Sequence, residues 1–172
     1  MKVTALSGSP LKRGNVARLI EMLLKEIGAA GKYEIIPSID IVPCQECEAC
    51  IQTGSCIIKS DKWGGIAKNM LKSDLIIIGS PVNFYGISGP LKTFLDRTYC
   101  LWHKRRLKGK KVILCTVDAR GADEALESLR LWAQTHEMKI IATISAECAK
   151  SKNIEKDKKT QQELKKIKKL FK

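Results

Sequence analysis

The sequence predicts an α/β domain built on an open parallel sheet of five strands, in the order 2-1-3-4-5, with helices on both faces. Five strand-like segments alternate with helix-like segments, which is typical of parallel sheets with crossover connections. One of these segments, residues 75–79 (LIIIG), has no polar face, as expected for a strand covered on both sides. Right-handed crossovers then place helices on both faces. At 172 residues the chain is long enough to bury one core.

The strands are predicted from short apolar or alternating runs that end at turn residues. The five predicted strands cover residues 2–6, 33–41, 75–79, 110–117 and 139–145. Pro37 lies inside the second run, and proline cannot donate a hydrogen bond to a neighbouring strand. The second strand is therefore expected at the edge of the sheet or at a bulge.

Apolar residues at helical spacing predict the helices between these strands. The clearest helix runs from Val16 to Ile27, with Asn15 as its N-cap and Gly28 marking its end. Further apolar stripes predict helices over residues 63–71, over residues 88–102 with a proline in the first turn, over residues 125–133, and from residue 154 into the tail. The tail helix is expected to pack on the sheet with its lysines outward.

Long loops follow strands one, three and four, at residues 7–15 (SGSPLKRGN), 80–86 (SPVNFYG) and 118–121 (DARG). Because carboxyl ends of parallel strands meet at one edge, these loops are expected to share a ligand site there. The first loop combines glycines, hydroxyls and cations and opens onto a helix N-terminus, a combination that suits a phosphate. An ordinary strand–helix turn is the alternative for this loop. The loop does not contain the G-x-G-x-x-G dinucleotide fingerprint.

Four of the seven cysteines lie within thirteen residues, at Cys44, Cys47, Cys50 and Cys56, with the spacing C-x-x-C-x-x-C-x5-C. A metal or iron–sulfur centre, a disulfide framework and coincidence are the three explanations. The N-terminus does not read as a signal peptide, and no apolar run approaches the length of a membrane helix. We therefore expect a cytoplasmic protein without membrane association, where stable disulfides are uncommon.

The spacing of these thiols favours an iron–sulfur cluster over zinc. Cysteine thiolates at two-residue gaps are usual ligands of a 4Fe-4S cluster, whereas zinc more often takes two C-x-x-C pairs separated by a longer span. Zinc remains the main alternative. Of the other cysteines, Cys115 is predicted to be a core residue, and no role is assigned to Cys100 or Cys148.

The formal net charge of +13 is concentrated at the C-terminus. Residues 150–172 contain ten lysines against three acidic residues, a net charge of +7. Nucleic acid, an acidic protein partner and simple solubility could each account for it. Because the tail has no interleaved aromatic residues that would stack on bases, we favour a solvated helix face and do not expect nucleic-acid binding.

Three motifs together resemble a known family. Ser7-x-Ser9-Pro10-x-x-x-Gly14-Asn15, residues 78–82 (IGSPV) and residues 86–97 (GISGPLKTFLDR) look like the NADPH-dependent FMN reductase group of flavodoxin-like proteins. The cysteine run narrows the resemblance to the iron–sulfur flavoproteins. The resemblance covers roughly residues 1–145 and implies a flavodoxin-like fold, FMN and one 4Fe-4S cluster.

The resemblance also implies the site residues by position. The residues expected at the FMN phosphate are Ser7, Ser9, Pro10, Arg13, Gly14, Asn15 and Val16. Those expected along the flavin ring and ribityl chain are Pro81, Val82, Asn83, Phe84, Tyr85 and Gly86, with Asp118 and Gly121 on the other side. The four cysteines of the run would bind the cluster. Val16 stands where the family usually has Thr or Ser, and Asn83 where a Tyr is common, so both changes are expected to lower FMN affinity.

The resulting hypothesis is an electron-transfer flavoprotein, and thus a flavin-dependent oxidoreductase, that passes electrons between cluster and FMN. We expect residues 1–150 to form the FMN-binding domain with the iron–sulfur loop at 43–60, and residues 151–172 to form a basic helical tail. Expected partners are an acidic redox protein such as ferredoxin and further copies of the chain, as a dimer or tetramer. The alternatives are an NAD(P)H-dependent FMN or quinone reductase with a structural zinc, and a metal-knuckle nucleic-acid binder.

No catalytic acid, base or nucleophile is predicted, because the two cofactors perform the redox steps. The two histidines are weak candidates. His136 continues an apolar helix stripe and is expected to pack at the helix edge, and His103 begins a basic run, HKRR, typical of a solvated helix end.

Overall fold

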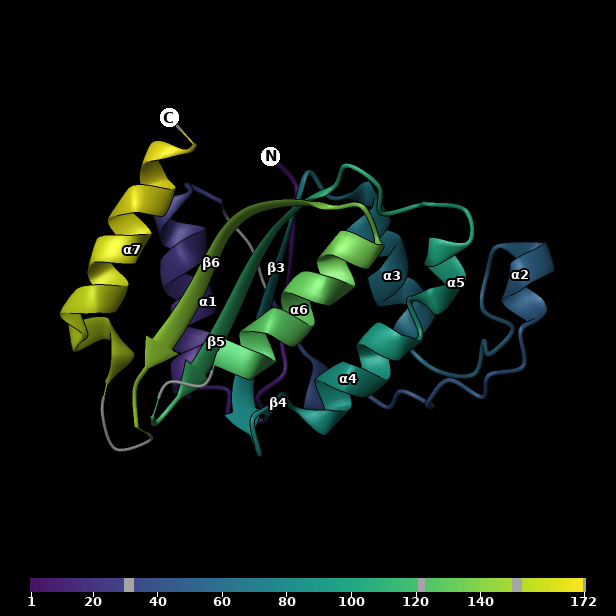
Figure 1. The fold of residues 1–172 in the computed structure, drawn as a ribbon, viewed down its shortest axis with the longest axis horizontal. Helices are drawn as coiled ribbons and strands as arrows, with labels where there is room; N and C mark the ends of the chain where they lie inside the picture. The colour runs from purple at the N-terminus through teal and green to yellow at the C-terminus, as the bar shows by residue number, and fades with distance from the viewer. Residues whose placement is uncertain (30–32, 121–122, 150–152, 172) are drawn as a thin grey trace.

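The computed structural model describes residues 1–29, 33–120, 123–149 and 153–171, and its strands and helices alternate along the chain (Figure 1). The strands are β1 (Val3–Ser7), β2 (Tyr33–Ile35), β3 (Leu75–Asn83), β4 (Gly86–Ile87), β5 (Lys111–Asp118) and β6 (Lys139–Glu147). The α-helices are α1 (Asn15–Glu26), α2 (Ala49–Thr53), α3 (Trp63–Lys72), α4 (Gly89–Asp96), α5 (Tyr99–Trp102), α6 (Asp123–Thr135) and α7 (Lys158–Lys169). Short 3-10 turns, η1 (Ile36–Ser38) and η2 (Ile154–Lys156), follow β2 and precede α7.

The parallel sheet has the order β2-β1-β3-β5-β6, which confirms the predicted order 2-1-3-4-5. Its register places Ala5 opposite Ile77, and Ile77 opposite Ile113. The short strand β4 was not predicted. It pairs antiparallel with the end of β3, Val82 opposite Ile87, so β3 continues past the sheet into a hairpin.

The second strand is at the edge, as predicted, but it is much shorter than the predicted span of residues 33–41. β2 pairs only through Tyr33–Ile35, and η1 follows at once with Pro37 in its first turn. Proline has no N–H to donate, and its fixed φ suits the start of a helical turn. The chain therefore leaves the sheet at Ile36.

The helix after β1 begins one residue earlier than expected. Gly14 is the N-cap, with φ −76° and ψ 170°, and Asn15 is the first helical residue, so the prediction of Asn15 as the cap is wrong. At the other end Gly28 adopts φ +65°, the left-handed conformation that glycine tolerates best, which confirms it as the stop signal.

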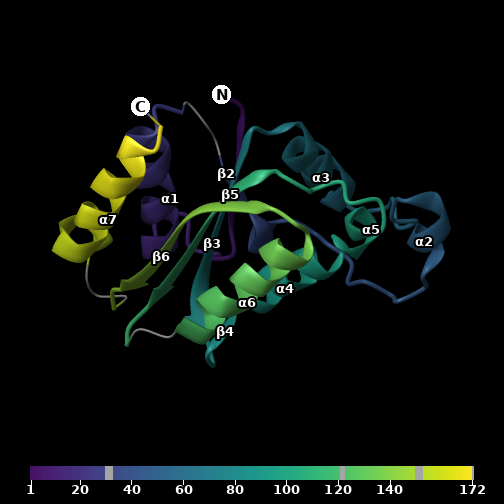
Figure 2. The same ribbon diagram turned by 45° about the horizontal axis from the view of Figure 1, so that its top comes forward.

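Two apolar layers cover the two faces of the sheet. Ile76 and Ile78 of β3 face a cluster formed with α3, α4 and α6, whereas Leu75 and Ile77 face α1 and α7. Figures 1 and 2 show these two helix groups on opposite sides of the strands. The alternation explains why a strand without a polar face is buried. No described helix is long and apolar enough to cross a membrane.

The predicted helix over residues 88–102 is broken. α4 ends at Asp96, the hydroxyl of Thr98 donates to the Leu95 carbonyl, and the short helix α5 follows. Trp102, expected in the buried stripe, is 41% exposed, so that part of the prediction is wrong. The residue at the break, Arg97, is among the most deeply buried side chains in the described part of the chain.

Candidate functional site

A cavity of about 360 Å³ lies at the carboxyl ends of β1, β3 and β5, beside the start of α1. This is where an open parallel sheet places its ligands. The lining residues that were predicted are Ser9, Arg13, Gly14, Asn15, Val16, Pro81, Val82, Asn83 and Asp118. The lining residues that were not predicted are Leu11, Arg18, Val117, Ala119 and Cys148.

The remaining predicted cofactor residues are not among those that line the cavity. They are Ser7, Pro10, Phe84, Tyr85 and Gly86, while Gly121 falls outside the described residues. Arg18 carried a usable sequence signal, because it is a cation one helical turn after Gly14. No sequence signal pointed to Cys148, which reaches the cavity from the end of β6.

Ser7 braces the first loop from below. Its hydroxyl accepts from the N–H of Ser9 at 3.2 Å, and Ser9 Oγ in turn accepts from the N–H of Leu11 at 3.3 Å. Gly8 donates to the Gly79 carbonyl at 2.7 Å, and a Cβ on Gly8 would lie 2.7 Å from Ser88 Oγ. The loop thus needs glycine at this close approach to α4.

The start of α1 suits an anion. The first N–H groups of a helix have no partner within the helix, and its N-terminus carries partial positive charge. No acidic residue lies in the first turn, and Arg13 and Arg18 add full positive charges to the cavity wall. These features fit a phosphate group.

The Asn15 side chain has a structural role. Its amide donates to Cys148 Sγ at 3.3 Å and to the Ala149 carbonyl at 3.2 Å, and its oxygen accepts from the N–H of Ile154 at 3.4 Å. Asn15 therefore ties the start of α1 to the segment after β6.

The β3–β4 hairpin carries two exposed aromatic residues. Phe84 and Tyr85 have φ of 47° and 65°, and both side chains are exposed. Positive φ at both central residues matches a type I′ turn, which the twist of a two-residue hairpin favours. The two rings therefore project from the hairpin tip and do not form an inner wall of the cavity.

The cysteine run forms a loop with one short helix, α2, which contains Cys50. Cys47 is exposed, and the other three thiols of the run are half-buried. Burial raises the pKa of Cys50, a backbone hydrogen bond opposes this rise, and the charges of Cys44, Cys47 and Cys56 raise the pKa further. Among the described residues, no three His, Cys, Asp or Glu side chains converge on a position for a single metal ion. The donor set of four thiols fits an iron–sulfur cluster, in which each thiolate binds a different iron.

The spacer before Cys56 is hydrogen-bonded. Thr53 Oγ1 donates to the carbonyl of Ala49 at 3.1 Å and accepts from the N–H of Ser55 at 3.3 Å. The N–H of Gly54 donates to the Cys50 carbonyl at 2.8 Å. These bonds order the spacer between Cys50 and Cys56.

A buried ion pair lies under the loop. Arg97 and Asp61 approach to 2.7 Å, with side chains 0% and 1% exposed. Burial alone would raise the pKa of Asp61, but hydrogen bonds from Arg97 and Val42 lower it. Burial alone would lower the pKa of Arg97, but the hydrogen bond to Asp61 and the charge of Cys56 raise it. The sequence motif included Arg97 without indicating this role.

Cys100 is a fifth thiol near the loop. It is buried, and burial, followed by the charge of Cys56, raises its pKa to about 11. The sequence assigned it no role because its neighbours come from a distant segment. A thiol with so high a pKa stays protonated at neutral pH.

The loop and the cavity lie in different parts of the molecule. After β2 the chain runs past α4 and α5 to α2, which lies at the opposite end of the molecule from α1 in both views (Figures 1 and 2). Because the cysteine loop follows the second parallel strand, it is expected at the same sheet edge as the loops after the first, third and fourth predicted strands. The loop leaves from that edge, but α2 lies well away from it.

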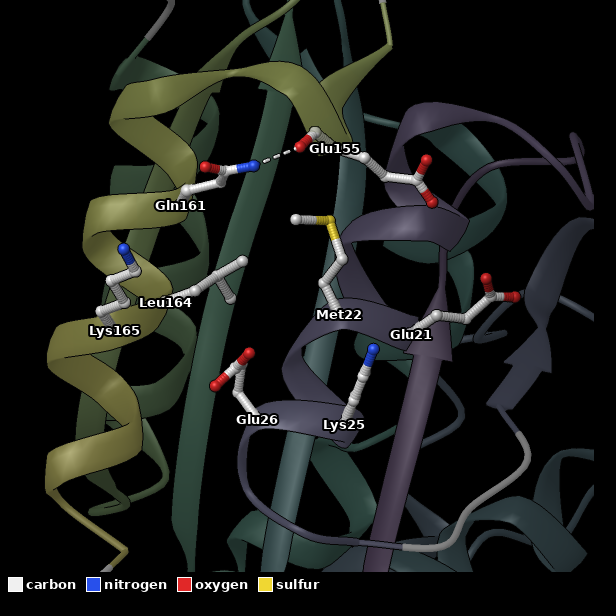
Figure 3. Close-up of a pocket in the computed structure, with 8 residues that line it drawn as sticks. All are labelled: Glu21, Met22, Lys25, Glu26, Glu155, Gln161, Leu164 and Lys165. Atoms are coloured by element: carbon white, nitrogen blue, oxygen red, sulfur yellow. Dashed lines mark hydrogen bonds between the residues drawn. The ribbon is translucent and has the colours of Figure 1, made fainter.

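A second cavity, of about 490 Å³, lies between α1 and α7 (Figure 3). It is lined by Glu21, Met22, Lys25, Glu26, Glu155, Gln161, Leu164 and Lys165. At one side of this cavity, the side-chain amide of Gln161 donates to the Glu155 carbonyl at 2.6 Å. Its wall mixes charges of both signs, and it lies on helix surfaces away from the strand ends. The cavity beside β1 is therefore the better ligand site.

The sequence profile of the NADPH-dependent FMN reductase family matches residues 1–151. The chain is 33% identical over 147 residues to an iron–sulfur flavoprotein of Methanocaldococcus jannaschii, covering 82% of this chain and 76% of that protein. It is also 33% identical over 114 residues to an iron–sulfur flavoprotein of Archaeoglobus fulgidus, covering 64% of this chain but only 51% of that relative. A Trp repressor binding protein from Bacillus subtilis has a similar fold, with a TM-score of 0.68 at 18% identity over 99% of this chain and 98% of that chain.

Proposed function

The chain belongs to the NADPH-dependent FMN reductase family and, within it, to the iron–sulfur flavoproteins, and on that premise we propose that it is an electron-transfer oxidoreductase. It binds FMN in the cavity beside β1 and an iron–sulfur cluster, of the 4Fe-4S type, at Cys44, Cys47, Cys50 and Cys56. FMN exchanges electrons singly or in pairs, and a cluster exchanges them one at a time. The pair thus links one-electron and two-electron chemistry.

One observation carries the proposal: a loop with four free thiols within thirteen residues and an anion-suited cavity occur in the same chain. In the cavity, Arg13, Arg18 and the N-terminus of α1 hold the phosphate. Ser7 and Ser9 maintain the loop, and residues 81–83 lie along the flavin. In this proposal residues 1–150 with loop 43–60 form the cofactor-binding domain, and residues 151–172 are the basic tail.

The proposal includes a homo-oligomer, a dimer or a tetramer. It is supported by the separation of α2 from α1 within one chain (Figure 1). In such an assembly the cysteine loop of one protomer faces the FMN cavity of its partner. Sedimentation velocity at micromolar concentration tests this, and a monomer with both cofactors bound would contradict it.

An acidic ferredoxin-type protein is the proposed electron donor. Lys104, Arg105 and Arg106 are exposed beside the cysteine loop, where Lys104 packs so closely that a Cβ on Gly54 would lie 2.9 Å from its Cγ. Positive charge at this position steers an acidic partner toward the cluster. The proposed location is the cytoplasm, where thiols remain reduced.

The second candidate is an NAD(P)H-dependent FMN or quinone reductase with structural zinc. The name of the family favours the reductase activity. Anaerobic purification separates the two. We expect brown protein with FMN and about four iron and four sulfide per chain, reduced faster by ferredoxin than by NADPH. Stoichiometric zinc without sulfide, and a plain yellow flavin spectrum, would overturn the cluster and favour the reductase.

A further inference from the structure

We propose that Arg97 positions the cysteine loop and that its buried positive charge raises the reduction potential of the cluster held there. This inference rests on the proposed function, because it requires a cluster at the four cysteines. It assigns a role to a residue that makes no bond to the iron.

Arg97 joins the two ends of the loop. Its Nη1 donates to the Val42 carbonyl at 2.6 Å and to Asp61 Oδ2 at 2.7 Å, and its Nη2 donates to the Ile58 carbonyl at 3.2 Å. Val42 lies two residues before the first cysteine of the run, and Ile58 lies two residues after the last. One planar guanidinium therefore fixes both ends of the cluster-binding segment.

Asp61 and Trp63 hold the guanidinium in place. Asp61 accepts from the N–H of Val42 at 2.9 Å and from the N–H of Trp63 at 3.2 Å. The indole of Trp63 lies 5.0 Å from the guanidinium carbon and donates to the Phe94 carbonyl. The Arg97–Asp61 pair thus connects the cysteine loop to α3 and α4, and both charged side chains are buried.

The charge of Arg97 acts on the cluster because it is buried and permanent. Arginine stays protonated at any working pH, and Coulomb interactions strengthen where water is excluded. The guanidinium donates to the carbonyl of Ile58, two residues after Cys56, and its Nε has no hydrogen-bond partner among the described residues. Reduction adds an electron to the cluster, so a nearby positive charge favours the reduced form. The negative charge of Asp61 acts in the opposite sense.

Three variants separate charge from geometry. Arg97→Gln removes the positive charge and should lower the equilibrium constant for cluster reduction at least tenfold, a shift of about 59 mV for one electron. Asp61→Asn removes the opposing charge and should shift the potential upward. Arg97→Lys keeps the charge but loses the planar guanidinium that donates to both ends of the loop. This variant should keep the wild-type potential and lose iron faster to a chelator.

The measurements are iron and sulfide content, the potential of the cluster by anaerobic titration, and iron loss to a chelator. Arg105→Gln is the matched control, because Arg105 is an exposed arginine that pairs with Glu137. It should change neither the potential nor the iron loss. A purely structural role would lower iron content in both Arg97→Gln and Asp61→Asn without shifting their potentials in opposite directions.

An unchanged potential in Arg97→Gln, or shifts of the same sign in Arg97→Gln and Asp61→Asn, would overturn the inference. If Arg97→Gln fails to fold, or folds without binding iron, the other two variants decide. An unshifted potential in Asp61→Asn would reject the charge effect. Wild-type iron retention in Arg97→Lys would reject the positioning role. A wild-type protein without iron or sulfide would instead refute the proposed function.

Discussion

The cavity beside β1 and the cysteine loop are stabilised in different ways. The cavity is bounded by strand ends and by the first turn of α1, elements that the sheet itself positions. The cysteine loop contains only one short helix, and three of its residues, Glu46, Glu48 and Gly54, have positive φ. Its anchor in the protein is the buried pair of Arg97 and Asp61.

Because of this difference, the two proposed cofactor sites should fail independently. A site formed by strand ends and a helix N-terminus exists before its ligand arrives. A loop anchored at its ends by one ion pair should gain further stability from a bound cluster, since metal–thiolate bonds contribute directly to folding.

Replacing one thiol should remove the cluster and leave the flavin. Cys47→Ser takes away one of four thiolates, and we expect complete loss of iron and sulfide with full FMN occupancy, measured by metal analysis and the flavin spectrum. Cys115→Ser is the control, because Cys115 is buried in β5 with its thiol 3.3 Å from the Ile78 carbonyl. A full cluster in Cys47→Ser would refute the ligand assignment.

Removing a cation from the cavity wall should weaken FMN binding and leave the cluster in place. Arg13→Ala should weaken FMN binding about 10- to 100-fold, since hydrogen bonds to charged groups contribute about 1.5–3 kcal/mol. Fluorescence titration of FMN measures this, and cluster content should not change. Lys12→Ala is the matched control, because the neighbouring cation is not among the residues that line the cavity. Equal affinities in the two variants would place the phosphate elsewhere.

Acid should destabilise the protein through His136. His136 is buried, its Nε2 lies 2.9 Å from Thr98 Oγ1, and burial lowers its pKa to about 4. Because this lies below the unfolded value of about 6.5, the unfolded chain takes up the proton first. Stability is then complete above pH 6.5 and falls as the pH drops from about 6.5 to 4.

Urea unfolding of the wild type and His136→Gln at pH 7 and pH 5 tests this. The wild type should lose more stability between the two pH values than the variant does. The structure confirms that His136 packs at the helix edge, where it contacts Trp132. An equal pH dependence in both proteins would refute its role.

The smallest expected effect is a gain. Val16 lines the cavity without a hydroxyl, and Val16→Thr supplies one hydrogen bond of about 0.5–1.5 kcal/mol, equivalent to a roughly 2- to 10-fold tighter FMN complex. Val3→Thr, on β1 and away from the cavity, is the control. Weaker FMN binding in Val16→Thr would show that the phosphate does not reach this position.

Much of the fold could be predicted because it is encoded in local periodicity. The apolar run at 75–79 correctly indicated the buried parallel strand β3, and the stripe from Val16 to Ile27 correctly indicated the crossover helix after β1. Periodicity failed where one residue has a tertiary partner. The apolar stripe at 88–102 continues past Arg97, but the helix is interrupted there. The guanidinium of Arg97 contacts Asp61, which lies 36 positions earlier in the chain.

The candidate site was predictable to the extent that it lies on loops after strands. Residues 13–16 and 81–83 line the cavity as expected, because strand ends and a helix start determine their place. Cys148 and the Arg97–Asp61 pair could not be found, since their neighbours come from distant segments. The position of α2 was also missed, because a loop's direction depends on the surface against which it packs.

The amide of Asn15 gives the cavity an influence beyond its own walls. Through its bonds to Cys148, Ala149 and Ile154, the first residue of α1 anchors the segment that leads into α7, a helix that does not contribute to the cavity. A ligand that immobilises the start of α1 should therefore also slow local opening at Ile154 and at the start of α7. Deuterium uptake by the amides of α7 should therefore fall when flavin occupies the cavity.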